Sequence, residues 1–433
     1  MLRSAASPHI VARVADVELT EPIRDLASID DSGRWAGMAW LLVRVDRTPL
    51  GTVTTPMSPA GLDRDEVIAA ISTTLGESLD RLALAHGVTG GISLDPDGFV
   101  PPWRAESERR RAAVLRNGPE LTVVVCTRDR PASLARCLDS VLAQAYPRFR
   151  VLVVDNSSTS SRATRDVAAA VASDRVETLV VPRTGLSHAR NAAVGATTGE
   201  HLAWIDDDEV ADAHWLSEIA QALIEQPAAD AVCGAVVPAT LDSPAQLWLE
   251  QFGGLTKGRG FTPAVFGPGT VDRRGALYPL PPFGAGANLA TRAGVIEQIG
   301  GFDPALGAGS LAGGGEDTVA LARILLSGGT IAYHPAALTR HFHRSEASEF
   351  RRQLIGYGTG LTAGYASLLR SDPRLLLPLL GLLPRAARDL FGDRSLRTAT
   401  LADDFPRDVL HANLRGMLAG PVAYVRGRYR NRR

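Results

Sequence analysis

The feature that most constrains the fold of this chain is a short apolar run that ends abruptly in carboxylates. Residues 202–205 are apolar, too few for a helix, and lie shortly after a Thr-Thr-Gly turn, which predicts a buried parallel strand. The run is followed by Asp206, Asp207, Asp208 and Glu209. Because alternate side chains of a strand face the same way, Asp206 and Asp208 should point together from its carboxyl end, where open α/β sheets bind ligands. Such hard oxygen donors suit Mg²⁺ or Mn²⁺ shared with nucleotide phosphates, and the alternative is a solvated acidic turn that caps the next helix.

Two earlier apolar runs also end in polar residues. Residues 121–126 lead into Thr127 and Arg128, and residues 151–154 lead into Asp155. A helical pattern lies between the two runs, and strand–helix–strand units of this kind form parallel sheets whose polar loops gather at one edge. The expected fold class is therefore α/β, with a Rossmann-like, mostly parallel sheet and helices on both faces.

The composition limits the class of protein. The chain has 433 residues, of which 45% are hydrophobic and 21% charged, and this suits a globular protein of two domains plus extensions. A formal net charge of -1 gives no general electrostatic case for nucleic-acid binding. The three cysteines have no metal-type spacing, and neither a signal-like start nor a membrane-spanning apolar run is evident. We therefore expect a cytoplasmic protein, in solution or at the inner face of the plasma membrane.

The pattern along the chain suggests three parts. Residues 1–118 are expected to form a small α+β module and a linker, in which Asp63 and Glu66 make a capping box at the start of an amphipathic helix. Residues 119–345 contain the strand–helix units and are expected to be the catalytic domain. Residues 346–433 are expected to form a helical extension with a basic tail, since the last twelve residues contain five arginines and no acid.

The order and spacing of these segments resemble the inverting family 2 glycosyltransferases of GT-A fold. The matching segments span about residues 121–343. They are VVVCTRDRPASLARCLDSVLAQ, VLVVDNSS, GLSHARNAAVGATTGEHLAWIDDDE, FGAGANLATR, GGFDPALGAG and GGGEDTVALARILLSGG. Agreement of so many segments in one order makes a chance match improbable.

The resemblance implies a nucleotide site at the first two strand ends. It assigns Thr127 and Arg128 to the nucleotide cleft and Asp155 to the base, with an ordinary Asx turn as the alternative for Asp155. A carboxylate can accept a hydrogen bond from the imide N–H of uracil or thymine, a contact that adenine cannot offer, so a UDP- or dTDP-linked donor is expected. Arg190 would contact a phosphate or hold the acidic loop, and a plain salt bridge to a nearby aspartate is the alternative.

The resemblance also implies a divalent metal, Mn²⁺ or Mg²⁺, as the cofactor. It gives Asp208 the direct metal contact and places Asp206 at the ribose or in the metal shell. The family often supplies one further ligand downstream, for which His341 is the first choice and His343 the reserve. A lone histidine is usually structural, and that remains the alternative here.

Donor sugar and acceptor are assigned in the same way. Asp207, and Asn288 in the Gly-Ala-Asn segment, would line the donor sugar, although the glycines beside Asn288 could instead serve only a tight turn. Asp317 would be the catalytic base and Glu316 would position the acceptor. The alternative is that Glu316 and Asp317 have no catalytic role and are only placed favourably at the positive end of a helix dipole.

Together these observations predict a metal-dependent inverting glycosyltransferase that acts in cell-surface or secondary-metabolite glycan assembly. Its partners would be a nucleotide sugar and a glycan, lipid-linked or small-molecule acceptor, with no nucleic acid. The apolar segment 375–383 and the basic tail are compatible with a peripheral membrane contact or with packing on the catalytic domain. The alternatives are a sugar nucleotidyltransferase of related fold, whose usual Gly- and Lys-containing loop is missing at residues 127–131, and a non-catalytic carbohydrate-binding protein, which would have lost the acidic residues.

Overall fold

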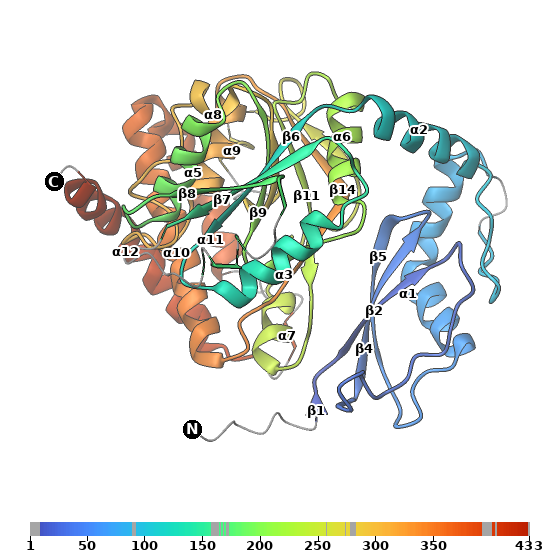
Figure 1. Cartoon of the computed structure of the whole chain (residues 1–433). Helices are drawn as coiled ribbons and strands as arrows, with labels where there is room; N and C mark the ends of the chain where they lie inside the picture. Colours follow the sequence, from blue (N-terminus) through green and yellow to red (C-terminus); the bar gives the residue numbers. More distant parts are fainter. Residues whose placement is uncertain are drawn as a thin grey trace.

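The structure, a computed structural model, describes residues 9–88, 92–156, 164, 166–167, 169, 173–256, 258–272, 274–277, 283–391, 401–402 and 405–431. Its centre is a nine-stranded sheet with helices on both faces. Strands from the N-terminal part form a separate three-stranded sheet beside it (Figure 1). The predicted α/β class with a mostly parallel sheet is confirmed.

The N-terminal part consists of the small sheet and one long helix. The sheet has the order β2-β4-β5, formed by β2 (Arg13–Glu18), β4 (Met38–Val45) and β5 (Thr48–Pro56), and β1 (His9–Ile10) pairs separately with β3 (Trp35–Ala36). Helix α1 (Arg64–Ala85) begins at the predicted capping box of Asp63 and Glu66, and it buries Ile71, Leu75 and Leu79 in the core of this part. Helix α2 (Arg104–Asn117) then leads to the central sheet.

The central sheet has the order β10-β14-β11-β13-β9-β6-β7-β8, with β12 paired to β14. The pairs β6–β7, β7–β8, β6–β9 and β11–β14 are parallel, whereas β10, β12 and β13 pair in the antiparallel sense. The strands are β6 (Leu121–Thr127), β7 (Phe149–Asp155), β8 (Val176–Val180), β9 (His201–Asp206), β10 (Glu209–Ala211), β11 (Ala231–Pro238), β12 (Ala264–Phe266), β13 (Asn288–Thr291) and β14 (Ile331–His341). Burial on both faces explains why the central strands are almost continuously apolar.

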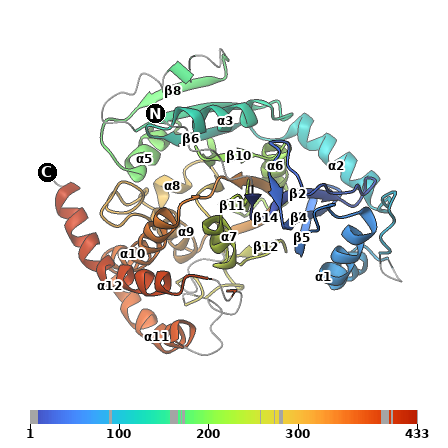
Figure 2. The same ribbon diagram turned by 90° about the horizontal axis from the view of Figure 1, so that it is seen from below.

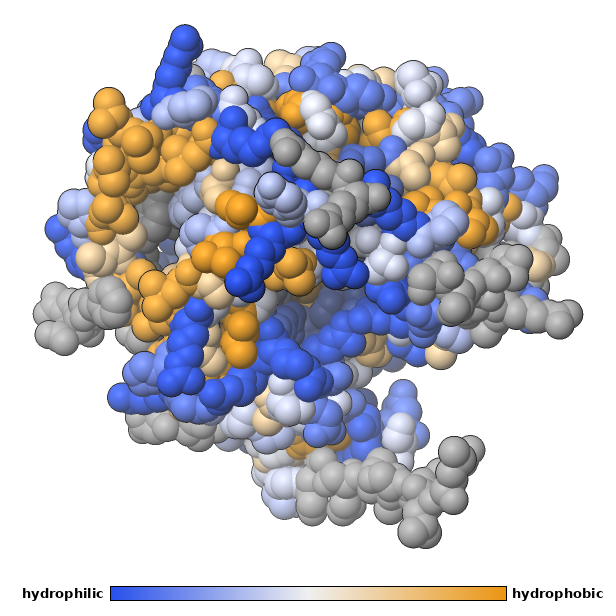
Figure 3. Space-filling view, turned by 90° about the vertical axis from the view of Figure 1, so that its left-hand side faces the viewer, coloured by the Kyte–Doolittle hydropathy of each residue, from blue (hydrophilic) through white to orange (hydrophobic). Residues whose placement is uncertain are grey.

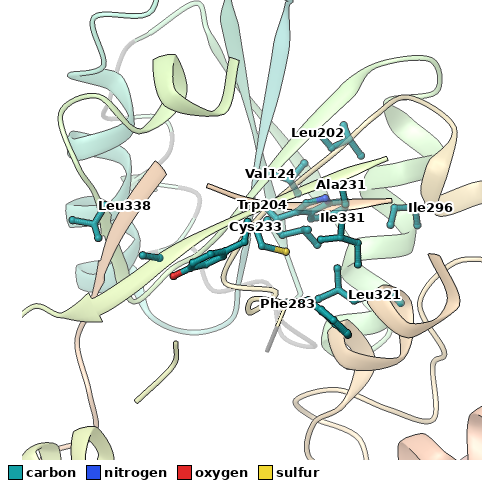
Figure 4. Close-up of a cluster of buried hydrophobic side chains, with 14 of the residues drawn as sticks. Val124, Leu202, Trp204, Ala231, Cys233, Phe283, Ile296, Leu321, Ile331 and Leu338 are labelled. Atoms are coloured by element: carbon teal, nitrogen blue, oxygen red, sulfur yellow. The ribbon is translucent and has the colours of Figure 1, made fainter. Parts of the chain in front are cut away.

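Alternate residues of these strands enter two different cores. Val124 and Trp204 belong to the cluster of Figure 4, which is completed by residues of α5 (Leu186–Ala196), α8 (Val295–Gln298) and α9 (Glu316–Leu326). Val125 and Ile205 face the opposite way, toward α3 (Pro131–Leu142) and α6 (Trp215–Glu225). The strand period of two thus decides which helices each strand end will face.

The C-terminal part is helical, as expected. It comprises α10 (Ala347–Ser371), a short 3-10 turn (Pro373–Leu375), α11 (Leu376–Phe391) and α12 (Asp408–Asn431), and Figure 2 shows α10 and α12 side by side at the edge opposite the N-terminal sheet. A side chain at Gly358 would collide with the backbone of Asn413, and one at Gly420 with Thr362, so glycine allows the close approach of α10 and α12. Tyr424 of α12 donates a hydrogen bond of 2.8 Å to Asp303, which ties this part to the loop before α9. Within the described ranges, no helix has the length and apolar character needed to cross a membrane.

Candidate active site

The polar ends of three neighbouring strands meet at one edge of the central sheet. In the sheet register Thr127 pairs with Asp155, and Cys126, one residue earlier, pairs with Asp206. Asp155 is fully buried at the end of β7, whereas Arg128 is largely exposed and lies 3.6 Å from Asp129. The predicted site residues of β6, β7 and β9 therefore do come together, although Arg128 points to solvent rather than into the cluster.

The next residue, Asn156, was missed by the sequence reasoning although it fixes the edge of this site. Its amide nitrogen donates to the carbonyl groups of Val181 and Arg183, and its amide oxygen accepts from the N–H of Gly185, which precedes α5. The signal available in the sequence was an asparagine directly after a strand-end aspartate.

The acidic residues diverge after the strand. Strand β9 ends at Asp206, and the next two residues form a turn to β10, so the strand alternation that predicted a shared direction for Asp206 and Asp208 does not extend to Asp208. Asp207 accepts a hydrogen bond of 2.7 Å from the Thr127 hydroxyl, on the α3 side of the sheet. Asp208 lies 2.9 Å from Arg130, 3.4 Å from His341 and 3.5 Å from Arg344.

These different surroundings give Asp207 and Asp208 opposite pKa shifts. Burial raises the pKa of Asp207 to about 6, the charge of Asp208 adds to the rise, and Thr127 and Arg130 oppose it. Burial would also raise the pKa of Asp208, but His341 and the nearby guanidinium groups outweigh it and bring the pKa below its ordinary value. Arg130 and Arg344, which sequence reasoning did not select, thus add to the effect of His341 in favouring the ionised form of Asp208.

Arg190 lies at the centre of the site. It is buried on α5, and its guanidinium reaches Asp206 at 3.2 Å, Glu316 at 3.1 Å and the carbonyl oxygen of Gly286 at 3.1 Å. The salt bridge that was the alternative for Arg190 is therefore present. One side chain connects the end of β9, the loop before β13 and the start of α9.

Glu316 and Asp317 begin α9 as expected and have different environments. The N–H of Gly286 donates to one carboxylate oxygen of Asp317 at 2.8 Å, and the N–H of Thr318 donates to the other at 2.7 Å. Glu316 is buried, and burial raises its pKa to about 7, with the charge of Asp317 adding to the rise and Arg190 opposing it. A side chain at Gly286 would come within 2.5 Å of the Cβ of Asp317, so glycine is needed there for close packing.

Asn288, which was predicted to contact the donor sugar, is held by hydrogen bonds within the fold. Its side chain is fully buried, its oxygen accepts from Trp215 Nε1 at 2.9 Å, and its nitrogen donates to the carbonyl groups of Ala235 and Ala337. All of its hydrogen-bonding groups are engaged, so Asn288 ties β13 to β11, β14 and α6 beneath the site.

The residues predicted to bind metal are only partly assembled. Asp208 and His341 face each other, whereas Asp206 is turned toward Arg190. Among the residues with described positions, no three His, Cys, Asp or Glu side chains group closely enough to hold a metal ion. A pair of protein ligands is still sufficient for Mg²⁺ or a similar cation when substrate phosphates supply further ligands, so one carboxylate and one imidazole fit a cation that is shared with a diphosphate.

Two hollows are relevant to the location of a ligand. One of about 210 Å³ is lined by Arg130, Asp208, His343 and Arg344, beside the acidic strand end. A larger one of about 490 Å³ lies between α9, α10 and α12, where Asp303 and Arg323 line it, and none of the predicted site residues reach it. The smaller hollow has the chemistry expected of a phosphate site, because it combines the guanidinium groups of Arg130 and Arg344 with the carboxylate of Asp208, a predicted metal ligand.

Comparison with known proteins gives four findings. Residues 122–300 match the family model described as glycosyl transferase family 2. The chain is 29% identical over 187 residues to the glucosyl-dolichyl phosphate glucuronosyltransferase of Haloferax volcanii. The aligned region makes up 42% of this chain but only 56% of that relative. It is 28% identical over 310 residues to the succinoglycan biosynthesis protein ExoO of Rhizobium meliloti, covering 70% of this chain and 83% of that relative. A solved mannosyltransferase from Pyrobaculum calidifontis, in complex with GDP-Man and Mn²⁺, is 19% identical, with a TM-score of 0.45 and coverage of 76% of this chain and 94% of that one.

Proposed function

This chain is a glycosyltransferase of family 2, with the family's domain at residues 122–300, and on that premise we propose that it is a metal-dependent inverting enzyme. It would move a sugar from a UDP- or dTDP-linked donor to an acceptor hydroxyl. The observation that carries the proposal is the position of Arg190, which contacts Asp206 at the strand end and Glu316 at the start of α9. The two acidic regions that inversion requires, one for the leaving group and one for the base, therefore adjoin.

The metal would be held at the strand end. Asp208 and His341 are the proposed ligands, with Asp206 next to them in the metal shell or at the ribose. When bound, Mn²⁺ or Mg²⁺ would act as a Lewis acid for the negative charge that grows on the departing diphosphate. Arg130 and Arg344, which now pair with Asp208, could turn to the phosphate oxygens of the donor and add charge-assisted hydrogen bonds.

Asp317 is the proposed catalytic base. It would take the proton from the acceptor hydroxyl as the oxygen attacks the anomeric carbon, on the face opposite the leaving diphosphate. The hydrogen bonds from the N–H groups of Gly286 and Thr318 fix the orientation of its carboxylate. Glu316 would position the acceptor indirectly, through its contact with Arg190.

Asp155 is the proposed contact to the nucleotide base, with Thr127 and Arg128 lining the same cleft. Its buried position at the end of β7 suits recognition of an imide N–H, because a buried carboxylate discriminates strongly against bases that lack that donor. Asp207, held by the Thr127 hydroxyl, remains the proposed contact to the donor sugar.

The acceptor is proposed to be lipid-linked, and the C-terminal helices to contact an anionic membrane. The relative from Haloferax volcanii is named for a lipid-linked substrate, a dolichyl phosphate. On α12 the exposed Leu418, Val422, Val425 and Tyr429 recur at helical spacing on one face. Exposed arginines of the same helix are Arg415, Arg426 and Arg430. Figure 3, which views the molecule from the side of α12, shows hydrophobic surface beside hydrophilic surface on this face, a combination typical of peripheral membrane contacts.

A donor screen tests the proposed reaction. The full-length protein would be incubated with Mn²⁺ and each of a set of UDP-, dTDP- and GDP-linked sugars, and released nucleoside diphosphate would be measured. Release from a UDP- or dTDP-linked sugar that is lost in Asp317→Asn is the expected result. Release only from GDP-linked sugars would refute the assignment of Asp155 to an imide base, and no release from any donor would refute the proposed reaction.

A further inference from the structure

A chain of close contacts runs from the acidic strand end into the interior. Nε2 of His341 lies 3.4 Å from Asp208, Nδ1 of His341 lies 2.7 Å from Nδ1 of His343, and Nε2 of His343 lies 2.8 Å from the Glu250 carboxylate. Both histidines are buried. Four side chains from three separate segments therefore form one continuous relay that ends at the proposed cation site.

The hydrogen-bonding roles along this relay follow from its chemistry. A carboxylate oxygen accepts, so Nε2 of His343 donates to Glu250. The two facing Nδ1 atoms share one proton, since one must donate and the other accept. If His341 is to bind a cation through Nε2, that atom must keep its lone pair free. The proton of the neutral His341 ring then lies on Nδ1, and Nδ1 of His343 is the acceptor. Both ring nitrogens of His343 are then used, so His343 is not a ligand itself.

Helix α7 (Pro244–Gln251) is anchored so that Glu250 stays in place. Gln246 Nε2 donates to the carbonyl oxygen of His343 at 3.1 Å, and the Ser243 hydroxyl donates to the carbonyl oxygen of Ser345 at 2.8 Å. The helix is thus bound to the same short segment that contains His343. Gly254 allows the chain to pass close to Glu250, because a Cβ there would come within 2.7 Å of the carboxylate.

We propose that Glu250 and His343 are positioning residues, which hold the His341 ring with Nε2 toward Asp208 and thereby set the affinity of the cation site. The inference rests on the proposed metal dependence. It assigns Glu250, which the sequence did not single out, and gives His343, the reserve ligand, a positioning role instead. Partners of this kind behind a metal-binding histidine fix its orientation and raise its basicity, and their loss commonly weakens metal binding by about 10- to 100-fold.

The test measures binding of Mn²⁺ alone, and of Mn²⁺ with UDP, to full-length protein by the electron paramagnetic resonance signal of the free ion. Glu250→Ala should raise the Mn²⁺ dissociation constant by about 10- to 100-fold. Glu250→Gln, which retains an acceptor oxygen at the same reach, should bind nearly as the unaltered protein does, whereas Glu250→Asp, which retains the charge but is one methylene shorter, should bind weakly. The Asp and Gln variants are mild enough to preserve folding, which thermal unfolding would confirm.

A matched control is available on the same strand. His334 of β14 pairs with Glu218 at 2.9 Å, so Glu218→Ala removes a buried carboxylate from a histidine that has no part in the relay. This variant should bind Mn²⁺ normally. Three outcomes would overturn the inference. Glu218→Ala could weaken Mn²⁺ binding as much as Glu250→Ala does, or both Glu250→Ala and Glu250→Asp could bind Mn²⁺ normally. The third is that Glu250→Gln weakens binding as much as Glu250→Ala. If the unaltered protein itself binds no Mn²⁺ even with UDP, the metal proposal fails, and the positioning role fails with it.

Discussion

Arg190 and Glu316 form a buried ion pair of 3.1 Å although they lie 126 positions apart in the sequence. The same guanidinium reaches Asp206 and the carbonyl oxygen of Gly286, so a single side chain holds together three segments of the site. Burial disfavours each charge on its own, and only the mutual contacts compensate for the lost hydration. The integrity of the whole active site should therefore depend on Arg190.

Arg190→Gln should destabilise the protein by about 3–5 kcal/mol, because it leaves the carboxylates of Glu316 and Asp206 without their cation. Urea unfolding at pH 8, above the raised pKa of Glu316, measures the change in the free energy of unfolding. The matched change Arg104→Gln breaks an exposed pair with Glu108 and should cost less than about 1 kcal/mol. Similar values for the two variants would show that the buried network contributes nothing special to stability.

A second prediction concerns pH. Burial, aided by the charge of Asp317 and opposed by Arg190, raises the pKa of Glu316 from its ordinary 4.5 to about 7. Between these values the folded protein holds a proton that the unfolded chain has released, so this group makes the free energy of unfolding fall as the pH rises through that window. Glu316→Gln removes the titration, and the variant should therefore gain stability relative to the unaltered protein between pH 5 and pH 8, by at most about 3 kcal/mol.

Urea unfolding of both proteins at pH 5 and pH 8 measures this difference. Loss of the contact to Arg190 adds an offset that is the same at both pH values, so only the change in the difference between them reports on Glu316. A difference that does not change with pH would contradict the raised pKa.

The strand ends of the site could be predicted from sequence because they depend on local patterns. The apolar runs before Thr127, Asp155 and Asp206 are strands, and parallel strands bring their carboxyl ends to one edge. The start of α9 at Glu316 and Asp317 was predicted for the same reason, since a glycine-rich segment precedes a helical period.

What could not be predicted depends on contacts between distant segments. Asn288 was assigned to the donor sugar, but its partners come from β11, β14 and α6, whose approach no local pattern reveals. Glu250 lies 93 positions before His343, and only the fold brings the two side chains together. The shared direction expected for Asp206 and Asp208 failed because the strand ends at Asp206, two residues before Asp208, so its alternation does not apply.

The third prediction is metal dependence. Chelation should abolish transfer, and Mn²⁺ or Mg²⁺ should restore it, because the diphosphate leaves as a dense negative charge. Asp208→Asn, which keeps the shape but removes the charge between Arg130 and His341, should not be rescued by added metal. Transfer by the chelated enzyme at its original rate would rule out the metal site.

The fourth prediction concerns the exposed apolar face of α12. Replacing Leu418 and Val422 by glutamate should reduce sedimentation with anionic lipid vesicles. The change removes exposed apolar side chains that the membrane would bury, and it adds charge repulsion. Binding of the unaltered protein should weaken with salt. Removal of the whole C-terminal part is a poor test, because α12 packs closely on α10 through Gly358 and Gly420. Leu84→Glu, on the equally exposed surface of α1, is the matched control, and equal sedimentation of all three proteins would refute a membrane role for α12.

The last prediction concerns the base. Asp317→Asn is nearly isosteric but cannot take a proton, so it should bind nucleotide and Mn²⁺ normally while losing transfer by about a hundredfold or more. Its oxygen can still accept from the N–H of Gly286 or Thr318, and the start of α9 should therefore stay in place. Glu316→Gln should cost less activity, since Glu316 acts through Arg190. Normal transfer by Asp317→Asn together with an inactive Glu316→Gln would reverse the two roles, and normal transfer by both would show that the base lies elsewhere.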